Sequence, residues 1–347
     1  MNERVLAAMS GGVDSSVAAA LLIEAGYRVS GVTLKLFRGA DDAAAAAAKK
    51  AAGALGIEHR VLDVTRAFSR DVVERFIAGY RSGETPNPCI DCNRYVKFGV
   101  LFDEAAASGA YLATGHYARI ERDRQTGRCL LKKAADQEKD QSYVLYRLTQ
   151  DRLSHTLLPL GGYKKADVRA IAKRYGCSTA ERESQEICFI PDHDHAAFIA
   201  RAAGAVAPEG DFVDTRGNVL GRHGGITRYT IGQRKGLGVS LGRPAFVVAI
   251  DPAANTVTLG EEKDLYAASL LVKDLHVVSG ERIEGALRVQ AKIRYAARPQ
   301  DATFTPLGEG TGRVDFDAPQ RAVTPGQAAV FYQGDTVVGG GTIVRAP

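Results

Sequence analysis

The stretch 4-RVLAAMSGGVDSS-16 runs from a short apolar segment into a turn of glycine and serine. Its apolar part is typical of a fully buried strand, and the next residues, Val17 to Ala25, predict a helix that ends at Gly26. A strand, a glycine turn and a helix in this order point backbone N–H groups and a helix N-terminus at an anion. We therefore expect a phosphate site, with Gly11 and Gly12 allowing close approach and serine hydroxyls donating hydrogen bonds.

The first 115 or so residues alternate between buried strands and helices. Strands are predicted at 29–37, 59–64 and 110–116, and the alanine-rich segment 41–56 predicts one of the intervening helices. Such alternation with short connections predicts an α/β domain with a doubly wound parallel sheet. The first turn matches neither G-x-x-x-x-G-K-[ST] nor G-x-G-x-x-G, which excludes the two most familiar nucleotide-binding fingerprints there.

The character of the sequence changes after residue 205. Helices are expected to dominate 141–202, whereas the later residues are rich in Gly, Val, Thr and turn signals and predict short strands. We expect a small β region in two parts, with a barrel or sandwich at the C-terminus. The predicted domains are a nucleotide-binding catalytic domain, a small central β-rich domain and a C-terminal β-barrel, at 1–202, 203–268 and 269–347.

The composition is that of a globular protein of 347 residues, of which 45% are hydrophobic and 24% charged. Because no apolar run is long enough for a signal-peptide core or a membrane span, we expect a cytoplasmic protein with no membrane partner. The net charge is +5. The segment Gly221 to Arg243 carries five Arg or Lys and no acidic residue, which favours a polyanionic partner, although a solvated basic face explains it equally well.

The five cysteines are too few and too scattered for a disulfide framework, so those that matter are expected to act as thiols or ligands. Cys89 and Cys92 stand at C-x-x-C spacing in 85-TPNPCIDCNR-94, which suits a metal clamp, a reversible disulfide or a reactive thiolate. Cys92 precedes a predicted helix at 94–107, whose dipole would favour the thiolate. Cys129 and Cys177 match no motif and are interpreted as structural.

Several motifs together resemble known families. S-G-G-x-D-S resembles the PP-loop of the ATP pyrophosphatases, which bind ATP and cleave it between the α- and β-phosphates to leave an adenylated substrate. Taken with that loop, the remaining motifs resemble the tRNA-specific 2-thiouridylases, which thiolate the wobble uridine of bacterial tRNAs, and they cover nearly the whole chain in order. These motifs are 85-TPNPCIDCNRYVKFG-99, 114-TGHYAR-119, 139-KDQSYVLY-146, 184-SQEICFIPD-192, 225-GITRYTIGQRKGLG-238 and 325-PGQAAVFY-332.

Thiolation of uridine explains the need for both ATP and cysteines. The C2 oxygen leaves poorly, so ATP with Mg²⁺ would adenylate it, and a sulfur nucleophile would then attack C2 and expel AMP. A protein donor can deliver that sulfur as a cysteine persulfide, and a second thiol then resolves the remaining bond through a disulfide. The resemblance implies that Cys188 carries the persulfide and that Cys92 is the nucleophile that helps to release the sulfur. For Cys188, a buried apolar cysteine is the alternative.

The resemblance also implies a set of binding residues. Those that frame ATP are Ala8, Met9, Ser10, Gly11, Gly12, Val13, Asp14, Ser15, Leu34 and Gly115. Those that line the target base are Asn87, Pro88 and Cys89. Further tRNA contacts are implied for His116, Lys139, Asp140, Gln141, Arg294, Tyr295 and Gln327. Because the base lies in the single-stranded anticodon loop, it can be splayed out and inserted into a pocket.

Cys89 departs from the family pattern, since many relatives have aspartate there. The group that transfers a proton near the base is then Cys89, Asp91 or Asp140, or the reaction needs no such group. Cys89, Cys92 and Cys188 could alternatively hold an iron–sulfur cluster that binds sulfide. A zinc site would need distant ligands such as His193 and His195, which are expected at a solvated helix start.

Two other functions compete with tRNA thiolation. Another PP-loop adenylating ligase would share the phosphate site but would need neither Cys92 nor Cys188. A non-catalytic RNA-binding or redox-sensing protein could be built on a degenerate PP-loop, but the intact 10-SGGVDS-15 argues against it.

Overall fold

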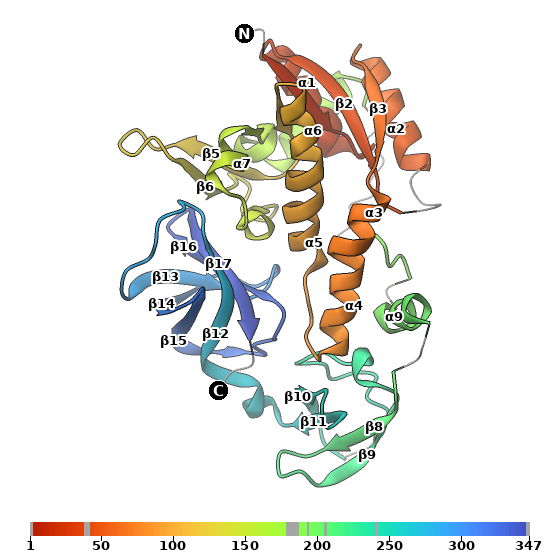
Figure 1. The fold of residues 1–347 in the computed structure, drawn as a ribbon, viewed down its shortest axis with the longest axis vertical. Coiled ribbons are helices and arrows are strands. Elements are labelled where there is room, and N and C mark those ends of the chain that lie inside the picture. Colours follow the sequence, from red (N-terminus) through yellow and green to blue (C-terminus); the bar gives the residue numbers. More distant parts are fainter. Residues whose placement is uncertain are drawn as a thin grey trace.

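The computed structural model describes residues 3–37, 42–177, 187–192, 194–204, 207–239 and 242–344. Figure 1 shows a parallel sheet with its helices at one end of the long axis, a β-barrel beside the middle of the molecule, and a small sheet at the other end. Two helical rods run between the two ends, next to the barrel. No helix in the described part of the chain is both long enough and apolar enough to cross a bilayer.

The first sheet is entirely parallel and has the order β3-β2-β1-β4-β7. Its strands are β1 (Arg4–Ala8), β2 (Arg28–Lys35), β3 (His59–Asp63), β4 (Ala110–Ala113) and β7 (Thr156–Leu157). Helices α1 (Val13–Glu24), α2 (Asp42–Ala54) and α8 (Lys165–Arg174) belong to the same unit. Alternate residues of β1 face opposite sides: Leu6 packs in a cluster with Phe102 of α6 (Leu101–Ala107), and Val5 packs with Leu22 of α1. The predicted doubly wound sheet is therefore confirmed.

The two rods each contain a stretch of π-helix. One consists of α3 (Thr65–Phe68), η1 (Ser69–Val73) and α4 (Glu74–Arg81), and the other of α5 (Pro88–Asp91), η2 (Cys92–Val100) and α6. The second rod begins six positions before the predicted start at Arg94, so that prediction was wrong. Asn87 caps the rod by accepting a hydrogen bond from the Cys89 N–H at 3.0 Å, and Pro88 occupies its first position.

Short helical elements prevail in the described part of 141–202, as predicted. They are η3 (Ser142–Leu145), α7 (Gln150–Ser154), η4 (Pro159–Gly162), α8 and α9 (His195–Ala203). Before them, β5 (Ala118–Arg122) and β6 (Cys129–Lys133) form a hairpin, which joins the edge of the C-terminal sheet at β17.

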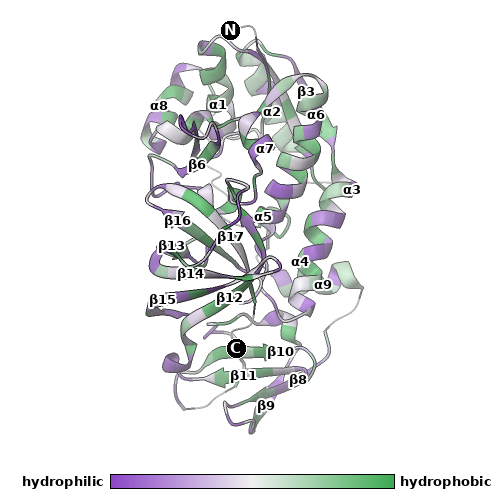
Figure 2. Ribbon diagram, turned by 60° about the vertical axis from the view of Figure 1, so that its left-hand side comes forward, coloured by the Kyte–Doolittle hydropathy of each residue, from purple (hydrophilic) through white to green (hydrophobic). Residues whose placement is uncertain are grey.

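The remainder is β structure in two parts, as predicted. The middle sheet has the order β10-β11-β8-β9, formed by β8 (Gly210–Val213), β9 (Val219–His223), β10 (Phe246–Asp251) and β11 (Thr256–Gly260). The C-terminal strands are β12 (Tyr266–Val277), β13 (Leu287–Lys292), β14 (Gln300–Gly308), β15 (Thr311–Arg321), β16 (Ala328–Gln333) and β17 (Thr336–Val344). β12 pairs with both β15 and β17, which closes a six-stranded barrel. Figure 2 shows many hydrophobic residues along β10 and β12. In the core of the barrel, Phe304 and Phe331 are fully buried.

Candidate active site

The loop between β1 and α1 is held in a conformation that only glycine tolerates. Gly11 has φ +77°, and a Cβ added there would lie 2.6 Å from the Ala44 carbonyl oxygen. The Ser15 hydroxyl accepts a hydrogen bond from the Ser10 N–H and donates one to the Gly12 carbonyl, both at 3.1 Å. The loop is therefore already ordered around the N-terminus of α1, the geometry that binds phosphate.

The residues predicted to frame ATP lie along one edge of the parallel sheet. Because β1, β2 and β4 are hydrogen-bonded neighbours, their carboxyl ends meet there, which is where ligands bind in open α/β sheets. Ala8 ends β1, Leu34 lies beside the end of β2, and Gly115 follows β4. A Cβ at Gly115 would lie 3.0 Å from the backbone of Asp14 and Ser15. The other predicted residues of this set are Met9, Ser10, Gly11 and Gly12 of the loop itself and Val13, the first residue of α1.

Asp14, in the first turn of α1, is the carboxylate of this loop. Its Oδ1 accepts a hydrogen bond from the Tyr117 hydroxyl at 2.8 Å, and both of its oxygens lie 2.8 Å from the Lys165 ammonium. Sequence reasoning missed both partners. Tyr117 stands inside 114-TGHYAR-119, and Lys165 is one of two adjacent lysines with nothing local to distinguish it.

The structure brings Cys92 and Cys188 to the same region. Cys92 is 8% exposed in a hydrophobic cluster that also contains Phe189, and Ile187 packs against this cluster. Cys188 and Cys89 each have an exposed surface, although neighbouring groups partly shield both thiols from water. All five cysteines are free thiols, and Cys129 and Cys177 are buried in other clusters, away from Cys92.

The protonation of these thiols differs from the prediction. Burial raises the pKa of Cys92, so its thiol is protonated at neutral pH, and the predicted thiolate at a helix N-terminus is wrong. Desolvation likewise raises the pKa of Cys188 to about 12, with Cys92 and Cys89 adding to the rise. Burial also raises the pKa of Cys89. Cys92 and Cys89 both raise the pKa of Cys188, and Cys89 raises that of Cys92, so the three thiols lie within electrostatic range of one another.

Lys97, on η2, is the cation that opposes these shifts, because its charge lowers the pKa of all three thiols. Within the described ranges it has no hydrogen-bond or ion-pair partner. A π-helix joins residue i to i+5, so it carries Lys97 toward the side of Cys92, whereas α-helical neighbours are three or four apart. Sequence reasoning missed this residue because π geometry has no clear sequence signal.

Three predicted tRNA contacts make hydrogen bonds within the fold: His116, Asp140 and Gln141. The His116 ring is 8% exposed and bonds Thr114 at 2.8 Å, and burial first and Lys97 second hold its pKa well below the usual value. The Asp140 carboxylate accepts hydrogen bonds from the Ala134 N–H at 3.0 Å and the Ser142 hydroxyl at 2.8 Å. The Gln141 Oε1 accepts one from the Tyr117 N–H at 2.9 Å. Lys139, next to them, is half-buried.

Asp91, next to Cys92 on the rod, raises the pKa of that thiol through its charge. It lines a cavity of about 380 Å³ with Asn87, Arg94 and residues of the barrel. Burial raises its pKa, while the charges of Arg75, Arg147 and Arg94 lower it. Of the three acid/base candidates, Cys89 is exposed and Asp91 is half-buried, whereas Asp140 is buried and organises a turn.

The predicted tRNA residues of the barrel have different environments. The Arg294 guanidinium donates to the carbonyls of Arg321 and Ala322, at 2.5 and 2.9 Å. Tyr295 is 40% exposed, and its ring centroid lies 6.1 Å from that of Tyr143. Tyr295 is thus the more accessible of this pair. Gln327 donates a hydrogen bond to the Thr85 carbonyl.

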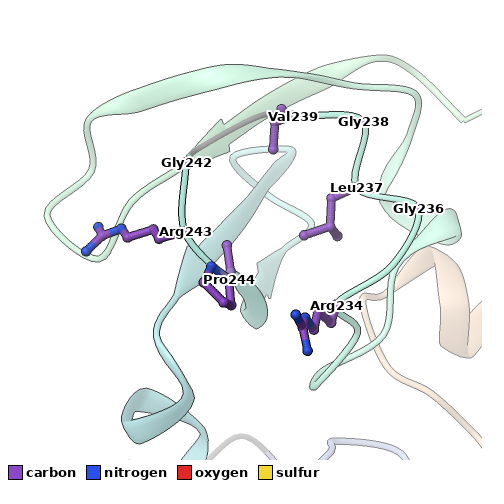
Figure 3. A pocket seen from close by; sticks show the side chains of 9 residues that line it. Arg234, Gly236, Leu237, Gly238, Val239, Gly242, Arg243 and Pro244 are labelled. Atoms are coloured by element: carbon purple, nitrogen blue, oxygen red, sulfur yellow. The ribbon is translucent and has the colours of Figure 1, made fainter.

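The described residues near the end of the basic segment line a cavity of about 510 Å³ (Figure 3). Arg234 and Arg243 both contribute to its lining. Carboxylates from outside the segment neutralise part of its charge, because Arg222 pairs with Asp211 at 2.8 Å and Arg243 with Glu261 at 2.6 Å. Arg234 and Lys235 are exposed and have no such partner among the residues described.

The placement of the side chains does not support an iron–sulfur cluster or a zinc site. In the described segments no group of three or more His, Cys, Asp or Glu side chains is arranged to hold a metal. His193 lies outside the described residues. His195 begins a helix as predicted, but it is half-buried rather than solvated. Its ring centroid lies 4.7 Å from that of Tyr80, because α9 packs against α4 there.

Comparison with known proteins identifies the family. Three family models match successive parts of the chain: "tRNA methyl transferase HUP domain" at 3–192, "tRNA methyl transferase PRC-barrel domain" at 196–261 and "Aminomethyltransferase beta-barrel domain" at 267–343. A tRNA-specific 2-thiouridylase MnmA of Clostridioides difficile is 49% identical, over 100% of this chain and 99% of the relative. The protein of the same name from Moorella thermoacetica is 51% identical, over 97% of this chain and 98% of the relative. The chain therefore belongs to the MnmA family of tRNA-specific 2-thiouridylases.

Proposed function

We propose that this chain is an ATP-dependent sulfurtransferase that replaces O2 of the wobble uridine of tRNA with sulfur. The curated relatives carry the name of this activity over the full length of the chain. The observation that carries the mechanism is that the residues flanking Cys188 pack into the hydrophobic cluster around Cys92. An adenylating ligase without sulfur chemistry would not require that convergence.

In the first step, O2 of uridine attacks the α-phosphate of ATP, and pyrophosphate leaves. The β1–α1 loop supplies backbone N–H groups and a helix N-terminus for the phosphates. Mg²⁺ accompanies the phosphates, and the Asp14 carboxylate is an oxygen donor of the kind that this ion prefers. The uridine would be splayed from the anticodon loop against Asn87, Pro88 and Cys89, at the N-terminal turn of the thiol-bearing rod.

In the second step, sulfur replaces the adenylated oxygen. A protein donor first transfers a sulfur atom to Cys188. The terminal persulfide sulfur then attacks C2, and AMP departs with O2. The Cys92 thiolate attacks Sγ of Cys188, which forms a Cys92–Cys188 disulfide and releases the 2-thiouridine. An external thiol reductant, as reaction partner, restores the two thiols.

Because the pKa values of the thiols are raised, the sulfur-transfer steps require a proton acceptor. Burial favours the protonated forms of Cys92 and Cys188, so each must lose a proton before it reacts. The Lys97 charge acts in the productive direction because it stabilises the developing thiolates. Because the thiolate is the reactive form, the raised pKa values would also slow oxidation of both thiols before the substrate arrives.

The proposal is tested with ATP, a persulfide donor protein and unmodified tRNA, by measuring pyrophosphate and 2-thiouridine separately. Cys92→Ser and Cys188→Ser should each abolish thiolation while ATP binding persists. Cys177→Ser is the matched control, since this thiol lies in a different cluster. A Cys188→Ser protein that thiolates at the wild-type rate would contradict the persulfide route, and tRNA-independent adenylation of a small carboxylate would favour a ligase.

A cluster-dependent route uses the same three cysteines and is the alternative mechanism. Cys89 is exposed and electrostatically coupled to Cys92, which is what favours keeping this alternative. Protein purified without oxygen and then freed of iron by chelation decides between the routes. Full thiolation by the iron-free protein with a persulfide donor supports the persulfide route, and activity that tracks iron content supports the cluster.

A further inference from the structure

Asp14 and Lys165 form an ion pair in the candidate phosphate site. The ammonium is 2.8 Å from both carboxylate oxygens, and the Lys165 side chain is 13% exposed. Lys165 is the first residue of α8, and its backbone N–H is held by Asp136 at 2.9 Å. A cation is thus fixed at the N-terminus of α1, where the backbone itself favours an anion.

The packing around Lys165 makes this placement rigid. Val17 and Ala18 of α1 share a hydrophobic cluster with Val168 and Ala172 of α8, so the two helices hold a constant relation. The ammonium also lies 5.7 Å from the centre of the Tyr117 ring, whose hydroxyl bonds Asp14. Any phosphate that reaches the loop meets an already positioned cation.

We propose that Lys165 binds the β- and γ-phosphates of ATP and the pyrophosphate that leaves, exchanging Asp14 for phosphate oxygens when nucleotide enters. This rests on the proposed function, because it assigns a ligand within its ATP site. Without nucleotide, Asp14 and Lys165 neutralise each other. With nucleotide, Lys165 turns to the phosphates, which stabilises charge developing on the leaving pyrophosphate, and the Asp14 carboxylate becomes free to face Mg²⁺.

A purely structural ion pair predicts a different pattern of effects. Such a pair would orient α1 against α8, and its loss would disturb every ligand of the site alike. A phosphate ligand affects only molecules that carry the β- and γ-phosphates. AMP, which lacks both, therefore separates the two roles.

The test is calorimetric binding of ATP, AMP and inorganic pyrophosphate to the full chain. In Lys165→Gln, affinity for ATP and pyrophosphate should fall by about 10- to 100-fold, as for a lost charge-assisted hydrogen bond, while AMP binding stays within about twofold. Lys173→Gln, exposed in the last turn of the same helix, should change none of the three. Thermal unfolding of both variants shows whether the fold is retained.

A second variant tests the exchange itself. With Mg²⁺ chelated, Asp14→Asn should bind pyrophosphate more tightly than wild type, because the competing carboxylate is gone, and adding Lys165→Gln should remove that gain. Equal losses for ATP and AMP, or no gain in Asp14→Asn, would overturn the role of Lys165 and leave tRNA thiolation untouched. Wild-type protein that binds neither ATP nor pyrophosphate would instead contradict the proposed adenylation.

Discussion

Gln327 of the barrel donates a hydrogen bond of 2.6 Å to the carbonyl of Thr85, the first residue of the segment that carries Cys89 and Cys92. The Thr85 N–H donates in turn to the Pro325 carbonyl at 2.8 Å. Two motifs that are far apart in the sequence, 85-TPNPCIDC-92 and 325-PGQAAVFY-332, therefore meet in the fold. The barrel positions the thiol-bearing rod, in addition to any contact it makes with RNA.

Gly326, between those two barrel residues, offers a stability test of this contact. It has φ +87°, and a Cβ there would lie 2.8 Å from the Glu84 Cβ and 2.9 Å from the Thr85 nitrogen. Gly334 also has a positive φ, +61°, but a Cβ added there would meet nothing within 4 Å. Gly334→Ala should cost about 1 to 2 kcal/mol of unfolding free energy. Gly326→Ala should cost at least about 1 kcal/mol more, because overpacking is added.

Urea unfolding measures both costs, and thiolation assays should show a loss of activity only in Gly326→Ala. Equal stabilities for the two variants would mean that residues 84–85 move at no energetic cost. The barrel would then not position the rod.

The main features of the nucleotide site could be predicted because their causes are local. The turn at Gly11 and Gly12 follows a strand and precedes a helix, and that order alone indicates a phosphate site. The state of Cys92 depends on burial by residues distant in sequence, such as Phe189, and on a π-helix, so no local pattern indicates it. The partnership of Asp14 with Lys165 likewise exists only because α1 packs on α8.

Substitution of Lys97 should change the pH dependence of the thiols. Because Lys97 lowers the pKa of Cys92 and Cys188, Lys97→Met should raise both and shift the pH profile of thiol alkylation toward higher pH. Arg94→Gln, on the same rod, is the control and should leave the profile unchanged, because the Arg94 charge acts on Asp91 and is not among the causes of the thiol shifts. Alkylation rates of the thiols, measured by mass spectrometry over a range of about pH 6 to 10, test this shift. Identical profiles for Lys97→Met and wild type would exclude Lys97 as the activating charge.

The same thiols link stability to pH. A pKa raised in the folded state means that the fold binds a proton that the unfolded chain releases near its ordinary pKa of about 8.5. The contribution of Cys188 to stability is therefore complete below about pH 8.5 and is lost as pH rises from there toward the folded pKa of about 12. Chemical denaturation at several alkaline pH values should show a steeper decline in wild type than in Cys188→Ser. Parallel declines would show that Cys188 is not desolvated.

Cys89 can be tested apart from the other two thiols. Its N–H is bonded to Asn87, but its thiol is not part of the disulfide step proposed for Cys92 and Cys188. Cys89→Ser should therefore retain thiolation within about tenfold, the loss expected if Cys89 only assists a proton transfer or contacts the base. Complete loss of 2-thiouridine together with loss of bound iron would point to the cluster route.

Salt dependence distinguishes the basic residues that face RNA from those already neutralised. Arg234 and Lys235 are exposed without carboxylate partners in the described part of the chain, so each Gln substitution should reduce the slope of log affinity against log salt by about 1. Arg222 and Arg243 are paired with Asp211 and Glu261, and their Gln substitutions should reduce the slope by clearly less. Fluorescence anisotropy with an unmodified tRNA over a salt series measures all four. Equal slopes for wild type and the Arg234 and Lys235 variants would show that the polyanion lies elsewhere.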